Sequence, residues 1–209
     1  MRSLFPGDIT IESGPLESTG GKVWDASVRF FDFLESSSVL STSSRIRVLE
    51  LGSGCGWLGM RIAKVHSDLS VTMSEQGSFG ALEWLNHNIS LNPELNVSAI
   101  ELDWARLPDE VCATKWDIVI GAELVYSYEG ARLLARVLKE ILSRSGATCF
   151  YAHSLNRFES VDECMLAEFS SQGLRVDIVY GHEALDHSIG SFTELFRELK
   201  LVIFKISFN

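Results

Sequence analysis

The sequence predicts an α/β fold: a doubly wound, mostly parallel sheet of seven strands whose last strand runs antiparallel. Three observations carry this prediction. Short apolar runs of strand length alternate with amphipathic helical patterns along the chain, as they do in parallel sheets covered by helices on both faces. A glycine-rich turn, residues 52–59, follows the first apolar run. The alternation then breaks near the C-terminus, where a polar segment separates the last two runs.

Seven apolar runs have the length and composition of buried strands. A serine-rich stretch, residues 36–44, precedes the first of them and is predicted to be a loop. The predicted strands span residues 46–51, 69–73, 97–101, 116–122, 148–151, 174–180 and 199–206.

Helices are predicted where apolar residues recur at helical spacing. The widest stripe follows the fourth strand and ends before Gly146, and a second stripe ends before Gly173. Glycine is a common residue just after a helix C-terminus. The three stripes consist of Leu133, Leu134, Val137, Leu138, Ile141 and Leu142; of Val161, Met165 and Phe169; and of Phe79, Leu82, Leu85 and Ile89.

The C-terminal region has a different pattern from the rest of the chain. Residues 181–191 are rich in Gly, His, Ser and Asp, and only a short helix over residues 192–198 fits before the final strand. We expect that strand to close the sheet antiparallel to its neighbours.

Size and composition predict one domain over residues 1–209, with an N-terminal segment (1–45) and a core (46–209). No apolar run approaches the roughly 20 residues that a spanning helix needs. Residues 1–7 lack the apolar core of a signal peptide. We therefore expect a protein that binds no membrane and resides in the cytoplasm, with the nucleus as a further location. We also expect a monomer, although no residue pattern determines the oligomeric state.

The net charge and the cysteine content indicate which classes of substrate and which kinds of site are expected. The formal net charge of −10 disfavours nucleic acid, whose phosphates it repels, and favours a basic substrate such as a lysine-bearing protein surface. The four cysteines lack paired spacing. Reduced thiols are therefore predicted, rather than a disulfide framework or a metal site.

The glycine-rich turn predicts a site for an adenosine-containing cofactor. A strand, a glycine turn and a helix in this order present bare backbone to such a ligand, and glycine allows the close approach. A nicotinamide-binding turn has the spacing G-x-G-x-x-G, but Trp57 stands where its third glycine would be. The order acid-x-G-x-G, from Glu50 to Gly54, favours S-adenosylmethionine.

Segments that follow later strands fit the same cofactor. Glu75 follows the second strand, where an acid can accept bonds from both ribose hydroxyls; the alternative is a solvated loop carboxylate. Asp103 and Trp104 follow the third strand, where an indole can pack on adenine or can simply cap the core. Glu123 and Tyr126 leave the fourth strand at the ligand-binding edge of the sheet, although Tyr126 can also be a half-buried loop aromatic.

Taken in order, these segments resemble the seven-strand protein-lysine methyltransferases (methyltransferase family 16). This group belongs to the class I, Rossmann-like enzymes and includes enzymes that act on chaperones and translation elongation factors. The resemblance spans residues 23–126 and rests on VWDA (23–26), the glycine turn, Glu75, ELDW (101–104) and GAELVY (121–126). It implies S-adenosylmethionine as cofactor and a lysine side chain of a protein as methyl acceptor.

The resemblance also implies residue roles. Trp24 and the backbone of Ala122 would hold the methionine end of the cofactor, Glu75 the ribose, and Trp104 with Asp103 the adenine. The remaining residues implied to contact the cofactor are Glu50, Gly52, Ser53 and Gly54. Glu123 and Tyr126 would form the acid-x-x-Tyr motif at the substrate entrance and act in catalysis. The family usually has Asp at the positions of Glu75 and Glu123, so the reach of both acids differs here by one methylene.

Two other functions stay open on these residues: a small-molecule N-methyltransferase, and a non-catalytic interaction protein that keeps the fold. The acid-x-x-Tyr motif favours the lysine enzyme over the first, and the intact cofactor set argues against the second. Three histidines are further candidates. For His153 a hydrogen-bonded structural role is favoured over substrate contact, and for His182 and His187 a solvated loop is favoured over a metal site. No metal is expected.

Overall fold

The computed structural model describes residues 9–14, 21–41, 46–155, 159–181 and 200–208. Its seven strands form one sheet in the order β3-β2-β1-β4-β5-β7-β6. Only β7 runs antiparallel to its neighbours β5 and β6, and the other pairs are parallel. The predicted fold class is thereby confirmed. The strands are β1 (Arg47–Leu51), β2 (Ser70–Glu75), β3 (Val97–Glu101), β4 (Ile118–Ala122), β5 (Thr148–Leu155), β6 (Leu174–Tyr180) and β7 (Lys200–Phe208).

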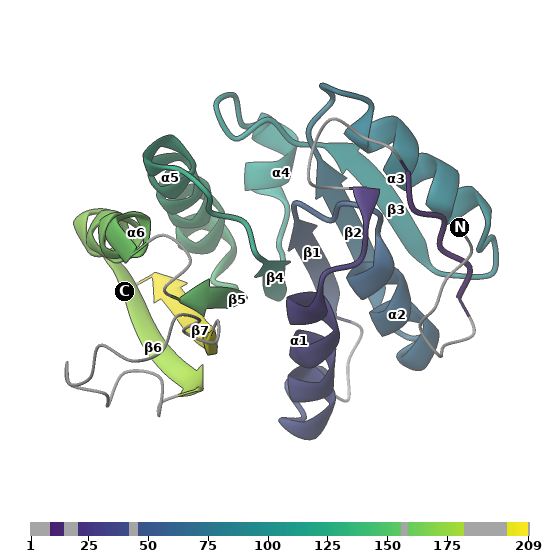
Figure 1. Cartoon of the computed structure of the whole chain (residues 1–209), viewed down its shortest axis with the longest axis horizontal. Coiled ribbons are helices and arrows are strands. Elements are labelled where there is room, and N and C mark those ends of the chain that lie inside the picture. Colours follow the sequence, from purple (N-terminus) through teal and green to yellow (C-terminus); the bar gives the residue numbers. More distant parts are fainter. Residues whose placement is uncertain (1–8, 15–20, 42–45, 156–158, 182–199, 209) are drawn as a thin grey trace, which may run out of the picture.

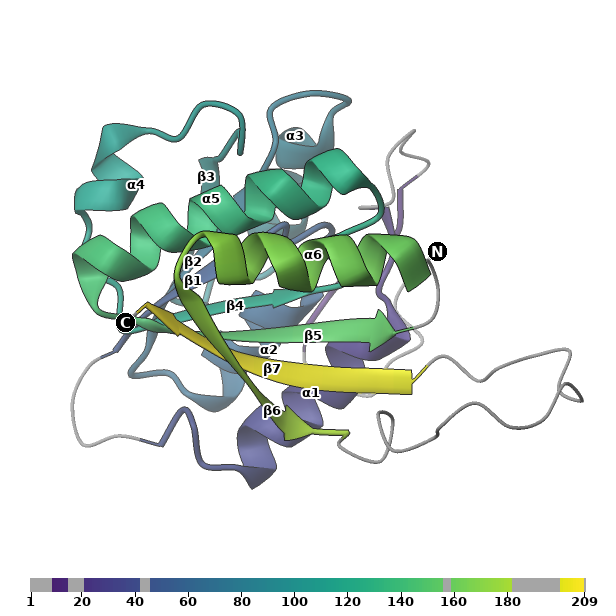
Figure 2. The same ribbon diagram turned by 90° about the vertical axis from the view of Figure 1, so that its left-hand side faces the viewer.

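In the described part of the chain, six helices cover the two faces of the sheet (Figures 1 and 2). Alternate residues of β1 show how the faces are shared: Val48 belongs to the core with α1, α2 and α3, and Leu49 to the core with α4, α5 and α6. This alternation follows from the two-residue period of a strand. The helices are α1 (Asp25–Ser36), α2 (Trp57–Val65), α3 (Ala81–Ser90), α4 (Asp109–Ala113), α5 (Tyr128–Ser145) and α6 (Glu159–Ser171).

Most predicted elements are present with shifted ends. β5 extends to Leu155 because its last residues pair with β7, ending at the pair Leu155–Lys200. β2 extends to Glu75, so this acid ends the strand rather than following it. α5 and α6 are followed by Gly146 and Gly173, both at positive φ as expected.

Phe79 was wrongly included in the third helical stripe. Helix α3 begins at Ala81, after Gly80 in the left-handed conformation. Phe79 itself has φ 59° and is 66% exposed. The short helix predicted over residues 192–198 and the polar loop up to residue 191 lie outside the described residues, apart from Gly181.

The N-terminal segment contains a helix, α1, that was not predicted from the sequence. In α1, Ala26, Phe30, Phe31 and Leu34 are buried in the core shared with α2. The residue before this helix is Trp24, its N-cap. Packing of α1 on the core therefore fixes where Trp24 stands.

Candidate active site

A single pocket brings together all eleven predicted site residues. It has a volume of about 330 Å³ and lies where β1, β2, β3 and β4 reach their carboxyl ends. From β1 the sheet continues through β2 and β3 on one side and through β4 and β5 on the other, so the strand order reverses at β1. Open α/β sheets bind ligands at such a reversal point. The predicted residues that line the pocket are Trp24, Glu50, Gly52, Ser53, Gly54, Glu75, Asp103, Trp104, Ala122, Glu123 and Tyr126.

The glycine turn after β1 forms the floor of the pocket. Gly52, Gly54 and Gly56 have φ of 59°, 55° and 84°, a region that side chains disfavour. A Cβ at Gly52 would also lie 2.7 Å from Leu124 Cδ2. The turn is fastened to β2, because the Ser53 amide donates to the Ser74 carbonyl at 2.9 Å. The chain thus presents bare backbone to the pocket in one fixed shape.

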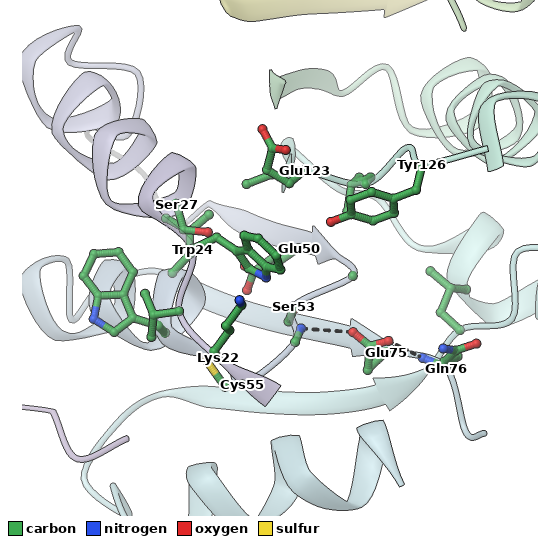
Figure 3. A pocket seen from close by; sticks show the side chains of 18 of the residues that line it. Lys22, Trp24, Ser27, Glu50, Ser53, Cys55, Glu75, Gln76, Glu123 and Tyr126 are labelled. Atoms are coloured by element: carbon green, nitrogen blue, oxygen red, sulfur yellow. Dashed lines mark hydrogen bonds between the residues drawn. The ribbon is translucent and has the colours of Figure 1, made fainter. Parts of the chain in front are cut away.

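Glu75 is held against the glycine turn. Its Oε2 accepts a hydrogen bond from the Gly54 amide at 3.0 Å, and its Oε1 accepts one from the Gln76 amide at 3.1 Å (Figure 3). Burial raises the pKa of the Glu75 carboxyl, and these two amides partly offset the rise. The carboxylate is therefore oriented before any ligand binds, and its remaining lone pairs are available to hydroxyl donors.

Glu50 lies below the turn and is 4% exposed. Burial raises the pKa of its carboxyl from 4.5 to about 8, against the opposing effect of hydrogen bonding to Ser53 and Gly59. Among the described residues its Oε2 has no hydrogen-bond partner. A buried acid in this state favours a cationic ligand group, which would stabilise its ionised form.

Trp24 and Lys22 reach the pocket from the segment before α1. Lys22 Nζ lies 4.3 Å from the centroid of the Trp24 ring, within the range of a cation–π contact. In the view of Figure 3 the indole stands between the Lys22 amine and the Tyr126 ring. Lys22 was missed in the sequence, where a lone lysine beside a tryptophan carries no signal. It is the one cationic side chain among the described residues that line the pocket.

Asp103 and Trp104 close the pocket beyond β3. The Asp103 Oδ1 accepts a hydrogen bond from the Ala105 amide at 2.9 Å, which folds the chain into a tight turn. Trp104 is half-buried against the core that contains α4 and α5. It therefore both lines the pocket and packs on the core, so the two interpretations of this residue are not exclusive.

Glu123 and Tyr126 stand after β4. Glu123 is 5% exposed and has φ 53°, an unfavourable conformation for a residue with a side chain. Its amide donates to the Ala152 carbonyl at 2.9 Å. Tyr126 is 37% exposed, and its hydroxyl points into the pocket (Figure 3). A buried acid and a tyrosine at the surface thus share one wall.

The other residues that line the pocket were not among the predicted site residues. Ser27 lies in the first turn of α1, and Gln76 follows Glu75. Cys55, Trp57 and Leu58 come from the turn and the start of α2, and Leu102, Leu124 and Leu133 from the segments after β3 and β4 and from α5. Their roles depend on three-dimensional proximity, which spacing along the chain does not encode.

The histidines and cysteines considered in the sequence analysis lie outside this pocket or outside the described residues, except Cys55, which lines the pocket. His153 is a buried, hydrogen-bonded structural residue, as favoured: it contacts Tyr151 and Asp162 at 2.8 Å each. His182 and His187 lie outside the described residues. The four cysteines are free thiols. In the part of the chain that the structure describes, no cluster of three His, Cys, Asp or Glu could hold a metal, and no helix is long and apolar enough to cross a membrane.

Comparison with known proteins identifies the family to which this pocket belongs. A family model described as lysine methyltransferase matches residues 5–170. The chain belongs to the lysine methyltransferase family. The predicted family, reaction and cofactor are thereby confirmed: its members transfer methyl groups from S-adenosylmethionine to lysine.

Individual relatives agree with this assignment. The chain is 32% identical over 163 residues to the protein N-lysine methyltransferase METTL21A of Danio rerio, covering 74% of this chain and 71% of the relative. It is 26% identical over 183 residues to the EEF1A lysine methyltransferase 3 of Mus musculus, covering 87% and 75%. A solved glycopeptide N-methyltransferase, MtfA with S-adenosyl-L-methionine, shares the fold with a TM-score of 0.57, 8% identity, and 86% and 94% coverage.

The pocket of this lysine methyltransferase fits its cofactor. A volume of about 330 Å³ lies within the range of small-ligand sites. The oriented Glu75 carboxylate suits a diol, and the buried Glu50 carboxyl suits an ammonium group. Gly52 and Gly54 line the pocket with backbone that carries no side chain. The residues present therefore fit the ribose diol and the ammonium group of S-adenosylmethionine.

Proposed function

We propose that this lysine methyltransferase modifies a lysine of a translation factor or chaperone, with Glu123 and Tyr126 at the reacting centre. The observation that carries the proposal is the common pocket of these two residues and the cofactor set. Similarity to the mouse EEF1A enzyme supports a translation factor as substrate.

Cofactor binding is assigned from the same pocket. Glu75 receives the ribose hydroxyls, because its carboxylate is already oriented by the amides of Gly54 and Gln76. Trp104 and Asp103 face the adenine. Trp24, Glu50 and the backbone of Ala122 hold the methionine end, and Gly52, Ser53 and Gly54 allow the chain to approach closely.

S-adenosylmethionine supplies a methyl group on a sulfonium, which a neutral amine can take by in-line displacement. The task of the protein is to align the lysine amine and to keep it neutral, and alignment alone can supply much of the acceleration. A free lysine has a pKa of about 10.4. Burial of its amine beside the apolar side chains of Trp24, Leu124 and Leu133 lowers that pKa.

Glu123 and Tyr126 then act on the amine directly. An ionised Glu123 close to the amine would favour the ammonium form, so its role is to orient the amine or to relay its proton. Tyr126 offers a hydroxyl as a hydrogen-bond partner from the exposed side of the pocket.

We expect Glu123→Ala and Tyr126→Phe each to reduce methyl transfer at least tenfold. The first removes a group that relays the proton of the amine, a role worth about 10²–10⁴ in rate, and the second removes a hydroxyl that orients the amine. Cofactor affinity should change less than threefold, since neither side chain is assigned to the cofactor. Transfer is measured with radiolabelled S-adenosylmethionine and cell lysate or purified elongation factor 1A, and affinity by calorimetry.

Gly54→Arg provides the opposite control, because an arginine at this positive-φ position fills the cofactor channel. It should abolish cofactor binding. Loss of binding in Glu123→Ala or Tyr126→Phe would show that the roles are misassigned. Label that appears only in small metabolites would show that the substrate is a small molecule and not a protein. No label at all would refute the proposed enzymatic activity.

We further propose that the protein acts as a monomer in the cytoplasm or nucleus, without binding nucleic acid. Four free thiols and a net charge of −10 support this setting. Sedimentation of the purified protein tests the oligomeric state, and cell fractionation tests the compartment.

A further inference from the structure

A buried chain of hydrogen bonds leads from helix α6 to the turn that carries Glu123. The Leu124 amide donates to the Tyr151 hydroxyl at 3.2 Å. The Tyr151 hydroxyl lies 2.8 Å from His153 Nδ1, and His153 Nε2 lies 2.8 Å from Asp162 Oδ1. Of these four hydrogen-bonded residues, only Leu124 lines the pocket. The chain of bonds therefore lies behind the site, not in it.

With an ionised Asp162 and a neutral His153, each bond has one direction. An ionised Asp162 only accepts, so His153 Nε2 carries a proton. In neutral histidine Nδ1 is then an acceptor, and the Tyr151 hydroxyl donates to it. The tyrosine oxygen is thereby left with its lone pairs facing the Leu124 amide. Burial raises the pKa of the Tyr151 phenol far above its usual value, which keeps the donating proton in place.

The segment held by these bonds needs support. Glu123 has φ 53°, and a non-glycine residue in this region is strained and persists only when its surroundings fix it. Two amides fix it here: Glu123 donates to Ala152, and Leu124 donates to Tyr151. Without the second bond, a partly buried amide would lose its partner and the turn would gain freedom.

Burial makes the arrangement specific. Tyr151, His153 and Asp162 are 1%, 3% and 7% exposed, so solvent has little access to replace a lost bond. Residues 151 and 153 lie two apart on β5 and therefore share one face of the sheet. Asp162 comes from the first turn of α6, so the helix and the sheet meet at this histidine.

We propose that Tyr151, His153 and Asp162 form a positioning relay that holds the Glu123–Leu124 turn in its catalytic conformation. The relay touches neither cofactor nor lysine and acts through the Leu124 amide. This inference rests on the proposed function of Glu123 for its effect on rate. The hydrogen bonds themselves are testable without any activity.

The decisive variant is Tyr151→Phe, which removes one hydroxyl and keeps the ring. We expect the Leu124 amide to exchange hydrogen at least tenfold faster, as measured by NMR, and methyl transfer at saturating cofactor to fall about tenfold. Calorimetric affinity for S-adenosylmethionine should stay within twofold, because the glycine turn is fastened separately by Ser53 and Ser74. In the wild type, ring ¹⁵N shifts should show His153 protonated at Nε2 alone.

Tyr128→Phe is the matched control. Tyr128 also donates a hydroxyl hydrogen bond, to Ser160 Oγ at 2.9 Å, but it is 49% exposed and lies outside the pocket lining. It should leave exchange at Leu124 and methyl transfer unchanged.

Three results would overturn the relay: unchanged exchange at Leu124 in Tyr151→Phe, unchanged transfer, or a loss of cofactor affinity as large as the loss of transfer. A wild-type His153 protonated at Nδ1 would also contradict it. A wild type that binds the cofactor but methylates no protein would instead refute the proposed function, while the exchange and tautomer results would still decide the relay.

Discussion

At the scale of single residues, the pocket depends on ionisable groups placed where solvent hardly reaches. Glu50 is the clearest case, because its folded-state pKa of about 8 lies far above the ordinary 4.5. Between these two pH values the folded protein keeps a proton that the unfolded chain releases. Stability therefore falls as the pH rises through this window.

We expect Glu50 to cost the cofactor-free protein about 2 kcal/mol between pH 6 and pH 8. Glu50→Gln keeps the shape and removes the titration, so this variant should lose about 2 kcal/mol less than the wild type over the same interval. Urea denaturation at both pH values measures the difference. If the two proteins lose stability equally, Glu50 does not carry the raised pKa.

Lys22 is a second residue whose role can be separated. As the cation among the described lining residues, it is expected to pair with the carboxylate of the cofactor. Lys22→Met should weaken S-adenosylmethionine binding about tenfold, in line with a charge-assisted bond of about 1.5 kcal/mol. Binding of 5′-methylthioadenosine, which lacks the amino-acid group, should not change.

Calorimetry with both ligands gives this comparison, and Lys22→Arg should restore most of the affinity. Equal losses for the two ligands would show that Lys22 supports the pocket through its contact with Trp24 instead.

At the scale of elements, α2 packs so closely against β1 and β2 at Gly59 that no side chain fits there. Gly59, the last glycine of the turn motif, lies in the first turn of α2. A Cβ there would come 2.5 Å from Glu50 Oε2 and 2.6 Å from Met73 Sδ. This glycine lets the helix approach the sheet closely.

Gly59→Ala should therefore destabilise the protein by about 1–3 kcal/mol, the usual range for overpacking, although alanine is the better helix former. Gly130→Ala in α5 is the control, since a Cβ there meets only Ser127 Oγ at 3.4 Å. Chemical denaturation of both variants tests the pair. Equal stabilities would mean that α2 can shift without cost.

The elements also show which features a sequence can predict. All seven strands follow from apolar runs, and α5 and α6 follow from clear stripes. Helix α1 was missed because three phenylalanines at positions 30, 31 and 33 blur its apolar face. The five-residue α4 is too short to show a period. The extra length of β5 comes from pairing with β7, a contact between distant segments.

The residues of the site likewise fall into those that the sequence predicts and those that it does not. Residues on the glycine turn and at strand ends are marked by residue type and spacing, and the structure brings all eleven together. Lys22 and the relay behind Glu123 are not marked, because they depend on which side chains of α6, β5 and the segment before α1 meet in space.

At the scale of the whole molecule, the net charge of −10 should influence the encounter with substrate. The screening length falls from about 30 Å at 10 mM salt to about 10 Å at 100 mM. We expect methylation of a basic protein at subsaturating concentration to slow several-fold over this range. A short uncharged peptide carrying the same lysine should show little change, and equal salt dependence would exclude steering.

The acidic character of the pocket has a consequence for turnover. Four acidic side chains line it, Glu50, Glu75, Asp103 and Glu123, against the single described lysine. Methyl transfer removes one positive charge from the bound cofactor, and S-adenosylhomocysteine is left with an uncharged thioether. Attraction between wall and ligand weakens with that charge. We therefore expect the pocket to bind S-adenosylhomocysteine more weakly than S-adenosylmethionine, so that methyl transfer itself promotes release of the by-product.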